Sequence, residues 1–233
     1  MRFFDLFCLK IIMNCARYID HTLLKPMATS VDIRHLCEEA IQYNFYAVCV
    51  NGCYVQLCND ILKSTEVKIA SVIGFPLGAM DTISKMNEME QALKHGADEI
   101  DMVINIGLLK DNKLTELKNE ITSIKNNMGS KILKVIIETC YLTNDEKRIV
   151  TEIVLESKAD FVKTSTGFGS GGATLDDILL LKSITQNKIQ IKASGGIRDY
   201  DTAQKYINLG VTRIGTSNGI QIVTHQIQQD TAY

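Results

Sequence analysis

The chain has 233 residues, of which 45% are hydrophobic and 22% charged, so it is long and apolar enough to bury a sizeable core. Its 25 lysines and arginines nearly balance its 27 aspartates and glutamates, which gives no electrostatic case for binding nucleic acid or an anionic membrane. Seven cysteines, an odd number spread through core-like segments, indicate reduced thiols and a cytoplasmic location. Cys49, Cys53 and Cys58 lack the paired spacing and nearby histidines of a zinc site, so neither a metal nor another cofactor is predicted.

The two ends of the chain differ from the central part, which we predict to be a single domain. Residues 1–15 are interpreted as an N-terminal extension, and Met13 offers an alternative start that the sequence leaves open. Asp5 and Lys10 interrupt its apolar stretch, which is too short and too charged for a membrane span and lacks a clean signal-peptide cleavage site. No linker rich in proline, glycine or serine follows, so residues 16–229 are predicted to form one domain, with a tail at 230–233.

Eight strand patterns alternate with eight helix patterns along the chain. Short apolar runs predict buried strands, and apolar residues three or four positions apart predict the helices between them. The predicted strands cover residues 18–24, 47–50, 67–75, 99–106, 132–138, 160–163, 189–192 and 211–215. Helices are predicted to begin near Ser30, Asp81, Thr143, Thr174 and Asp199, and the last helix to cover 220–229. Thr143 and Glu146 have the spacing of a capping box, in which each residue satisfies a backbone N–H of the other.

This alternation predicts an α/β fold with a parallel sheet. Strands that are apolar on both faces and joined by helices pair in parallel. Eight such units in a chain of this length favour a closed (β/α)8 TIM barrel, and a doubly wound open sheet is the main rival. No Gly-x-Gly-x-x-Gly turn follows the first strand, and polar residues gather at several strand ends, so the barrel is preferred. In a barrel these ends meet at one mouth, where active sites lie.

Two lysines end predicted strands in similar contexts. Lys163 precedes Thr-Ser-Thr-Gly and Lys192 precedes Ala-Ser-Gly-Gly. A charged amine in an apolar strand is costly, so such a lysine is either paired or held neutral, and a neutral amine can attack a carbonyl group. We therefore expect the two lysines to share one pocket.

Further polar residues occupy inward positions of the two middle strands. Because side chains alternate with period two, Asp101 and Asn105 share a face of one strand, and Lys134 and Glu138 share a face of the next. One interpretation is a structural ion-pair network of Asp101, Glu138 and the lysines. The other is a lysine nucleophile whose amine is kept neutral by a neighbouring cation. The spacing favours the second interpretation.

Glycine-rich turns follow the last two predicted strands. Gly195 and Gly196 come after Lys192, and Gly215 leads into Ser217 and Asn218. Loops after the last strands of such barrels can bind a phosphate group with backbone N–H groups. The alternative is that these glycines only form tight turns. Because the second turn is also rich in hydroxyl groups, we predict a small phosphorylated carbonyl compound as the substrate.

Six motifs, in unbroken order from about residue 18 to about residue 223, resemble those of the deoxyribose-phosphate aldolases. They are Tyr-Ile-Asp-His-Thr-Leu-Leu-Lys-Pro at 18–26, Val-Ile-Gly-Phe-Pro at 72–76, Glu-Ile-Asp-Met-Val-Ile-Asn at 99–105, Lys-Val-Ile-Ile-Glu-Thr at 134–139, Val-Lys-Thr-Ser-Thr-Gly at 162–167 and Lys-Ala-Ser-Gly-Gly-Ile-Arg at 192–198. The resemblance implies a class I aldolase that reversibly cleaves 2-deoxy-D-ribose 5-phosphate to acetaldehyde and D-glyceraldehyde 3-phosphate, without metal. It also implies a role in deoxyribose phosphate catabolism.

The resemblance also implies roles for individual residues. Lys163 matches the family's Schiff-base lysine, Lys192 matches the second lysine, which lowers the pKa of the first, and Asp101 matches the aspartate that relays protons. The phosphate group is expected to lie on Gly195, Gly196, Gly215, Ser217 and Asn218.

Three positions depart from the family's pattern or lie at its edge. Phe168 stands where some members have a lysine, so phosphate binding is expected to depend more on backbone N–H groups. Asn218 stands where a serine is common, and the chain ends in Tyr233, which some relatives use to reach the active site.

His21 and Cys49, both on predicted strands, have structural interpretations. His21 is expected to be a hydrogen-bonded core histidine, and Cys49 a packing residue near the mouth. Barrels of this type commonly dimerise, so a homodimer or higher homo-oligomer is expected.

Two rival functions are a different phosphosugar lyase and a non-catalytic phosphosugar-binding or regulatory protein. The second has no need of a neutral lysine, and the presence of Asp101, Lys163 and Lys192 together argues against it.

Overall fold

The computed structural model describes residues 15–225. Most of the predicted extension at 1–15, and the whole of the predicted tail at 230–233 with Tyr233, therefore lie outside the described residues. The boundaries of the domain predicted over 16–229 stay predictions.

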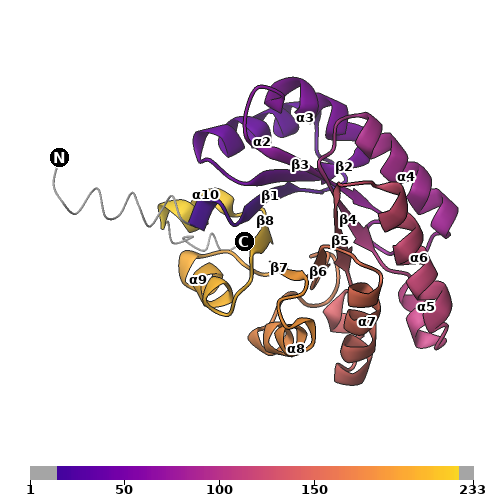
Figure 1. Ribbon diagram of the computed structural model, residues 1–233. Helices are drawn as coiled ribbons and strands as arrows, with labels where there is room; N and C mark the ends of the chain where they lie inside the picture. Colours follow the sequence, from indigo (N-terminus) through magenta and orange to yellow (C-terminus); the bar gives the residue numbers. More distant parts are fainter. Residues whose placement is uncertain (1–14, 226–233) are drawn as a thin grey trace.

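Eight parallel strands form a closed barrel in which each strand pairs with its neighbours in sequence. The strands are β1 (Ile19–Leu23), β2 (Ala47–Asn51), β3 (Lys68–Ile73), β4 (Glu99–Val103), β5 (Ile132–Ile136), β6 (Phe161–Lys163), β7 (Gln190–Ser194) and β8 (Arg213–Thr216). The ring closes where β8 pairs in parallel with β1, with Ile19 opposite Ile214 (Figure 1). The predicted (β/α)8 barrel is thus confirmed, and the open sheet is excluded because an open sheet leaves two edge strands unpaired.

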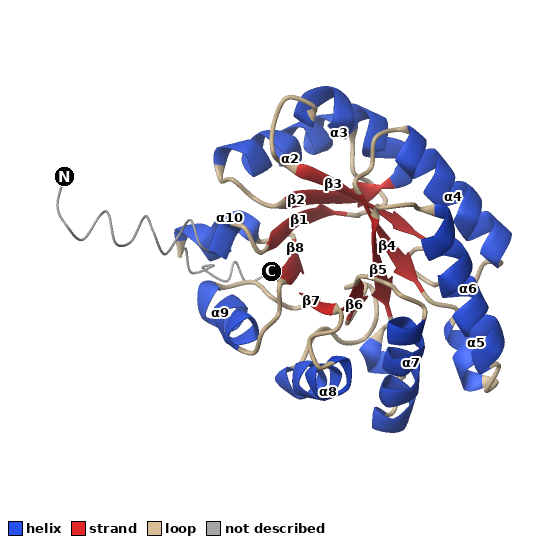
Figure 2. Cartoon of the chain, viewed as in Figure 1, coloured by secondary structure: helices blue, strands red, loops and turns tan. Residues whose placement is uncertain are grey.

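The helices form an outer ring around the strands (Figure 2). They are α2 (Ser30–Gln42), α3 (Val55–Leu62), α4 (Thr82–Lys94), α5 (Ile106–Lys110), α6 (Leu114–Asn127), α7 (Asn144–Glu156), α8 (Leu175–Thr185), α9 (Tyr200–Asn208) and α10 (Gly219–Thr224), with 3-10 turns at Gly52–Tyr54 and Thr139–Tyr141. One large cluster of buried apolar side chains fills the space between the helices and the outer faces of the strands. The residues that face into the barrel are therefore left to form the site.

The predicted helix caps are present, with one shift. Asp81, Thr174 and Asp199 each accept a hydrogen bond from a backbone N–H in the first turn of the following helix. The first cap is Thr29 and not the expected Ser30, because the Thr29 hydroxyl accepts from the backbone N–H of Asp32 and the Asp32 carboxylate accepts from the backbone N–H of Thr29. A second residue that completes a capping box therefore decided the start of α2.

Strands β4 and β5 end earlier than predicted, which corrects two of the expected inward residues. Asn105 is not on β4, because its side chain caps the short helix α5 by accepting a hydrogen bond from the backbone N–H of Leu108 at 3.3 Å. Glu138 lies beyond β5 with a left-handed backbone, φ +52°, and so breaks the period-two alternation. Asparagine side chains compete with strand pairing in this way by bonding to nearby backbone groups.

Within residues 15–225, no helix has the length and apolar character needed to cross a membrane.

The capping box at the start of α7 allows a test of local stability. Thr143 accepts from the backbone N–H of Glu146 at 3.2 Å, and Glu146 accepts from the backbone N–H of Thr143 at 2.7 Å. Thr143→Ala should lower the free energy of unfolding by about 1 kcal/mol because a helix N–H loses its partner. Urea denaturation measures this, and Thr143→Ser, which keeps the hydroxyl, should behave like the wild type. Equal stability of all three proteins would contradict the assignment.

Candidate active site

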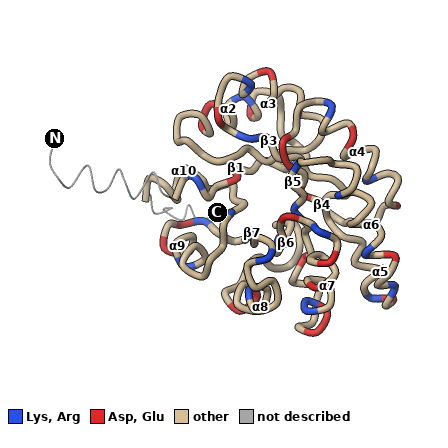
Figure 3. Tube along the Cα trace, in the orientation of Figure 1, with Lys and Arg blue, Asp and Glu red and all other residues tan. Residues whose placement is uncertain are grey.

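A cluster of charged side chains lies inside the barrel, under the mouth. Figure 3 shows charged residues on the central ring of strands as well as on the outer helices. The inward set contains three carboxylates and four cationic groups, all buried: Asp20, Glu99, Asp101, Lys134, Lys163, Lys192 and Arg213. Buried charges persist only when they are paired and hydrogen-bonded, so each contact in this cluster matters.

Asp101 is the centre of the cluster. Its Oδ2 lies 2.8 Å from Nζ of Lys163 and 2.7 Å from Nζ of Lys192, and its Oδ1 lies 2.7 Å from Nζ of Lys134. The structure thus brings together Asp101, Lys163 and Lys192, which lie far apart in the sequence, on one carboxylate. Lys134 completes the coordination of that carboxylate from the opposite oxygen.

A deeper layer of ion pairs, which the sequence analysis missed, lies below Asp101. Arg213 donates from Nη1 to Asp20 Oδ1 at 2.7 Å and to Glu99 Oε2 at 3.0 Å. Lys134 lies 2.5 Å from Glu99 Oε2, and Lys192 also contacts Asp20. The sequence contained a signal for this layer. Glu99 precedes Asp101 by two positions and Arg213 precedes Gly215 by two, and because side chains on a strand alternate with period two, each pair lies on one face.

Glu138 is not part of this network, which corrects the ion-pair interpretation that included it. Its carboxylate accepts hydrogen bonds from the backbone N–H of Thr166, 3.2 Å from each oxygen, and from the Thr166 hydroxyl. Glu138 therefore holds the loop that follows β6, and its backbone is left-handed at this point.

Burial lowers the pKa of the Lys163 amine; the Asp101 carboxylate opposes this effect, and the Lys192 ammonium adds to it, so that the net shift is downward. Burial alone would also lower the pKa of Lys192, but the carboxylates of Asp101 and Asp20 outweigh it and raise that pKa. The same balance raises the pKa of Lys134 through Asp101 and Glu99. Although burial disfavours the charged carboxylate, three lysines hold the pKa of Asp101 well below its usual range. Lys163 is thus the lysine of this cluster that most readily becomes a free amine.

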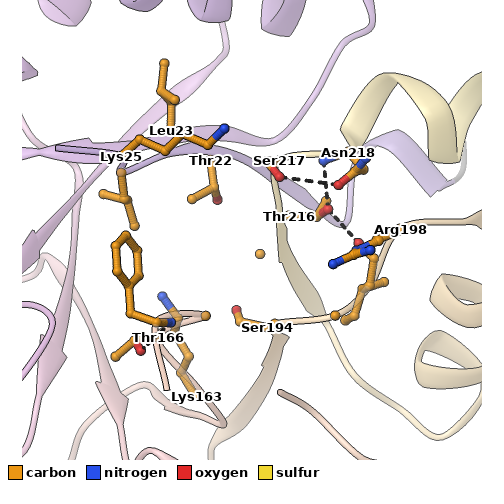
Figure 4. Close-up of a pocket in the computed structure, with 17 residues that line it drawn as sticks. Thr22, Leu23, Lys25, Lys163, Thr166, Ser194, Arg198, Thr216, Ser217 and Asn218 are labelled. Carbon is orange, nitrogen blue, oxygen red and sulfur yellow. Dashed lines mark hydrogen bonds between the residues drawn. The ribbon is translucent and has the colours of Figure 1, made fainter. Parts of the chain in front are cut away.

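A cavity of about 380 Å³ opens above Lys163 at the carboxyl ends of the strands. All five predicted phosphate-binding residues line it together with Lys163: Gly195, Gly196, Gly215, Ser217 and Asn218. Figure 4 shows Thr22 across the cavity from Lys163 and Ser194. The sequence analysis missed Thr22, Lys25, Ser194 and Arg198 as lining residues. Lys25 and Arg198 lie in two of the six motifs, but Lys25 comes after β1 and Arg198 after β7. The direction of a side chain beyond the end of a strand cannot be predicted from the residue pattern alone.

Two of the predicted glycines allow the cavity its shape for different reasons. Gly196 has φ +79°, a left-handed backbone that glycine adopts without steric cost. Gly215 is needed for space, because a Cβ there would lie 2.3 Å from Oγ of Ser194 and 3.0 Å from Cε of Lys192. The buried hydroxyl of Ser194 has no hydrogen-bond partner among the described residues and lines the cavity.

The remaining residues singled out in the sequence have simple environments. His21 is buried and its Nε2 lies 2.7 Å from Glu39 of α2, as expected for a hydrogen-bonded core histidine. Cys49 is fully buried, with Sγ 4.0 Å from Oδ2 of Asp101, and burial raises the pKa of its thiol. Phe168 is half exposed at the cavity rim and packs edge-on against Phe75, with ring centroids 5.2 Å apart. In the described part of the chain, no three His, Cys, Asp or Glu side chains form a group that could hold a metal ion.

The fold and the site together define a class of protein. A buried lysine with a lowered pKa lies at the base of a cavity in the mouth of a TM barrel, in contact with a carboxylate that a second, charged lysine shares. This is the arrangement of an enzyme that forms a Schiff base with a carbonyl compound.

Comparison with known proteins agrees with this class. Residues 15–222 match the model of the DeoC/LacD family aldolases, and the chain belongs to that family. A deoxyribose-phosphate aldolase of Thermococcus kodakarensis is 54% identical over 213 residues, covering 89% of this chain and 95% of that protein. One of Bdellovibrio bacteriovorus is 50% identical over 211 residues, covering 91% and 96%.

Solved structures show the same similarity. The structure titled "QR15, an Aldolase" is 41% identical with a TM-score of 0.88, and the match covers 91% of this chain and 95% of that one. A deoxyribose phosphate aldolase of Aeropyrum pernix, whose title describes a unique tetrameric structure, is 31% identical with a TM-score of 0.87; the match covers 94% and 93%.

The close contacts at Gly215 predict a loss of stability on substitution. Gly215→Ala should lower the free energy of unfolding by about 1 to 3 kcal/mol, because the new methyl group overlaps Ser194 and crowds Lys192. The matched control is Gly52→Ala, where the nearest atom to a Cβ, Oγ of Ser71, is 3.8 Å away. Urea denaturation should show the control at or slightly above wild-type stability. A Gly215→Ala protein as stable as the control would refute the steric argument.

Proposed function

We propose that this chain is a class I aldolase that reversibly cleaves 2-deoxy-D-ribose 5-phosphate to D-glyceraldehyde 3-phosphate and acetaldehyde, in the catabolism of deoxyribose phosphate. The observation that carries the proposal is the contact of Lys163 and Lys192 with one oxygen of Asp101 at the base of the cavity. Relatives at about half identity that are named deoxyribose-phosphate aldolases support the choice of substrate.

The nucleophile in this proposal is the free amine of Lys163. Its Nζ attacks the aldehyde carbon C1, and loss of water gives an iminium ion. The C2–C3 bond then breaks, its electron pair moves toward the iminium nitrogen to form an enamine, and the C3 hydroxyl loses its proton as D-glyceraldehyde 3-phosphate leaves. Protonation of the enamine at C2 and addition of water to the regenerated iminium release acetaldehyde and restore the amine.

Lys192 and Asp101 act in these steps with a water molecule to move protons at the C3 hydroxyl and at the enamine carbon. Lys192 stays protonated because two carboxylates hold it, and its charge disfavours protonation of Lys163. Asp101 lies 2.8 Å from Lys163, close enough to accept or return a proton at the amine.

The phosphate group of the substrate binds at the opposite side of the cavity, at the loops after β7 and β8. Backbone N–H groups at Gly195, Gly196, Gly215, Ser217 and Asn218 contact it in this proposal. Arg198 and Lys25, which line the same cavity, add positive charge.

We further propose that the protein is a cytoplasmic homo-oligomer. The six cysteines in the described part of the chain are all free thiols, which fits a reducing compartment. The Aeropyrum pernix relative, whose title describes a tetrameric structure, supports assembly from identical subunits.

Borohydride trapping tests the nucleophile. Incubation with 2-deoxyribose 5-phosphate and borohydride should attach the reduced substrate fragment to Lys163, as intact mass and peptide mapping will show. Lys163→Leu should give no adduct, and Lys188→Leu, which removes an exposed lysine, should give the wild-type adduct. If the folded wild type forms no adduct and releases no acetaldehyde, the aldolase assignment fails and a phosphosugar-binding protein becomes the better reading. Adducts with other phosphorylated aldehydes only would indicate a different lyase.

Arg198→Gln tests the phosphate site. Because a hydrogen bond to a charged group contributes about 1.5 to 3 kcal/mol, this change should raise KM for 2-deoxyribose 5-phosphate about 10- to 100-fold. The kinetic constants for unphosphorylated 2-deoxyribose should not change, and Lys188→Gln serves as the control for a lost surface charge. An equal effect on both sugars would remove Arg198 from the phosphate site.

A further inference from the structure

The buried cluster does not have balanced charges. Lys134, Lys163, Lys192 and Arg213 supply four cationic groups, whereas Asp20, Glu99 and Asp101 supply three carboxylates, and the side chain of each is at most 4% exposed. With every group ionised, the interior would carry a net charge of +1. A net charge in a medium of low dielectric constant is costly, and the loss of one proton removes it.

The contacts decide which group loses the proton. Arg213 cannot, because a guanidinium group stays protonated in proteins. Lys134 contacts Glu99 at 2.5 Å, Asp101 at 2.7 Å and Asp20 at 3.7 Å, and Lys192 contacts both Asp20 and Asp101. Of the three carboxylates in this cluster, Lys163 contacts only Asp101, at 2.8 Å, and Lys163 is the only one of these four cations that lines the cavity.

Among the described residues, no other titratable group inside the barrel changes this count. The neighbouring strands β2 and β3 contribute Cys49, Ala70 and Val72, and burial keeps the Cys49 thiol protonated by raising its pKa. At the mouth, Glu138 is bound to Thr166, while Lys25 and Arg198 are exposed and therefore screened by solvent. On the deep side, the guanidinium group of Arg213 lies 3.5 Å from the ring centroid of Tyr46 and 5.5 Å from that of Phe161, and these two rings add no charge.

We infer that Lys134 and Arg213 are positioning residues that keep Lys163 as a free amine, because they occupy the deep carboxylates Asp20 and Glu99 and leave Lys163 only a share of Asp101. Neither residue lines the cavity, so neither touches a substrate bound there. The inference rests on the proposed role of Lys163 as the nucleophile. In this inference the protonation state of Lys163 depends on all the charges in the barrel interior, and not on Lys192 alone.

Two kinds of substitution should shift the pKa of Lys163 in opposite directions. Removing a deep cation, as in Lys134→Met, leaves three carboxylates for three cations, so Lys163 keeps its proton to higher pH. Removing a deep carboxylate, as in Glu99→Gln, leaves four cations for two carboxylates, so Lys163 loses its proton at lower pH. A merely structural role for the network would not produce shifts of opposite sign.

The experiment measures the rate at which acetaldehyde is trapped on Lys163 by cyanoborohydride, as a function of pH, by peptide mapping of the Lys163 adduct, with the adduct on the exposed Lys188 as the background rate. Acetaldehyde has no ionisable group, so the midpoint of the profile reports the enzyme. Lys134→Met should move the midpoint upward by about one to three pH units, with about a tenfold loss of rate per unit on the acid side. Lys134→Arg, which keeps the charge, should keep the wild-type midpoint, and Glu99→Gln should move it downward.

Several outcomes are decisive. If Lys134→Met does not fold, the nearly isosteric Glu99→Gln still tests the inference through its downward shift. Wild-type midpoints in both variants, or shifts in the same direction, would overturn the inference while leaving the aldolase assignment intact. No adduct on the wild type at any pH would instead overturn the proposed function.

Discussion

The carboxylate of Asp101 is the interaction on which the rest of the site depends. One oxygen accepts from Lys163 and Lys192, and the other accepts from Lys134, so a single buried anion holds three buried amines. Buried ion pairs of this kind are weak contributors to stability, because the desolvation of each charge offsets much of the attraction. Their retention in the barrel interior is better explained by what they do to Lys163, whose pKa burial lowers while Asp101 only partly opposes the change.

The closed barrel is what makes such a cluster possible. Its seven ionisable groups come from six different strands, and only a closed sheet directs the inner faces of six strands at one axis. The same closure separates the cluster from water, which strengthens each electrostatic interaction. The large apolar core lies elsewhere, between the strands and the surrounding helices, and a small apolar cluster that includes Cys49, Ala70 and Val72 shares the barrel interior with the charges.

The site divides into two parts with different chemistry. Its floor is built from strand residues, and charge is the property that matters there. Its rim on the β7 and β8 side is built from the turns after those strands, and small size matters there: Gly215 leaves room for Ser194 and Lys192, and Gly196 adopts a left-handed turn. Thr166, held by Glu138, also lines the cavity. The floor suits a carbonyl group and the rim suits an anion, which is the pattern of a phosphorylated aldehyde.

The sequence by itself predicted the eight alternating units and most helix caps, and it singled out Asp101, Lys163 and Lys192 as candidates, because periodicity, capping chemistry and ordered motifs are local properties. Only the tertiary structure decided which polar residues meet. Period two assigns a residue to a face, but it assigns neither its depth along the barrel axis nor the point where the strand ends. For that reason Glu138 and Asn105, expected inside, belong to turns, whereas Glu99 and Arg213 lie inside and complete the charge count.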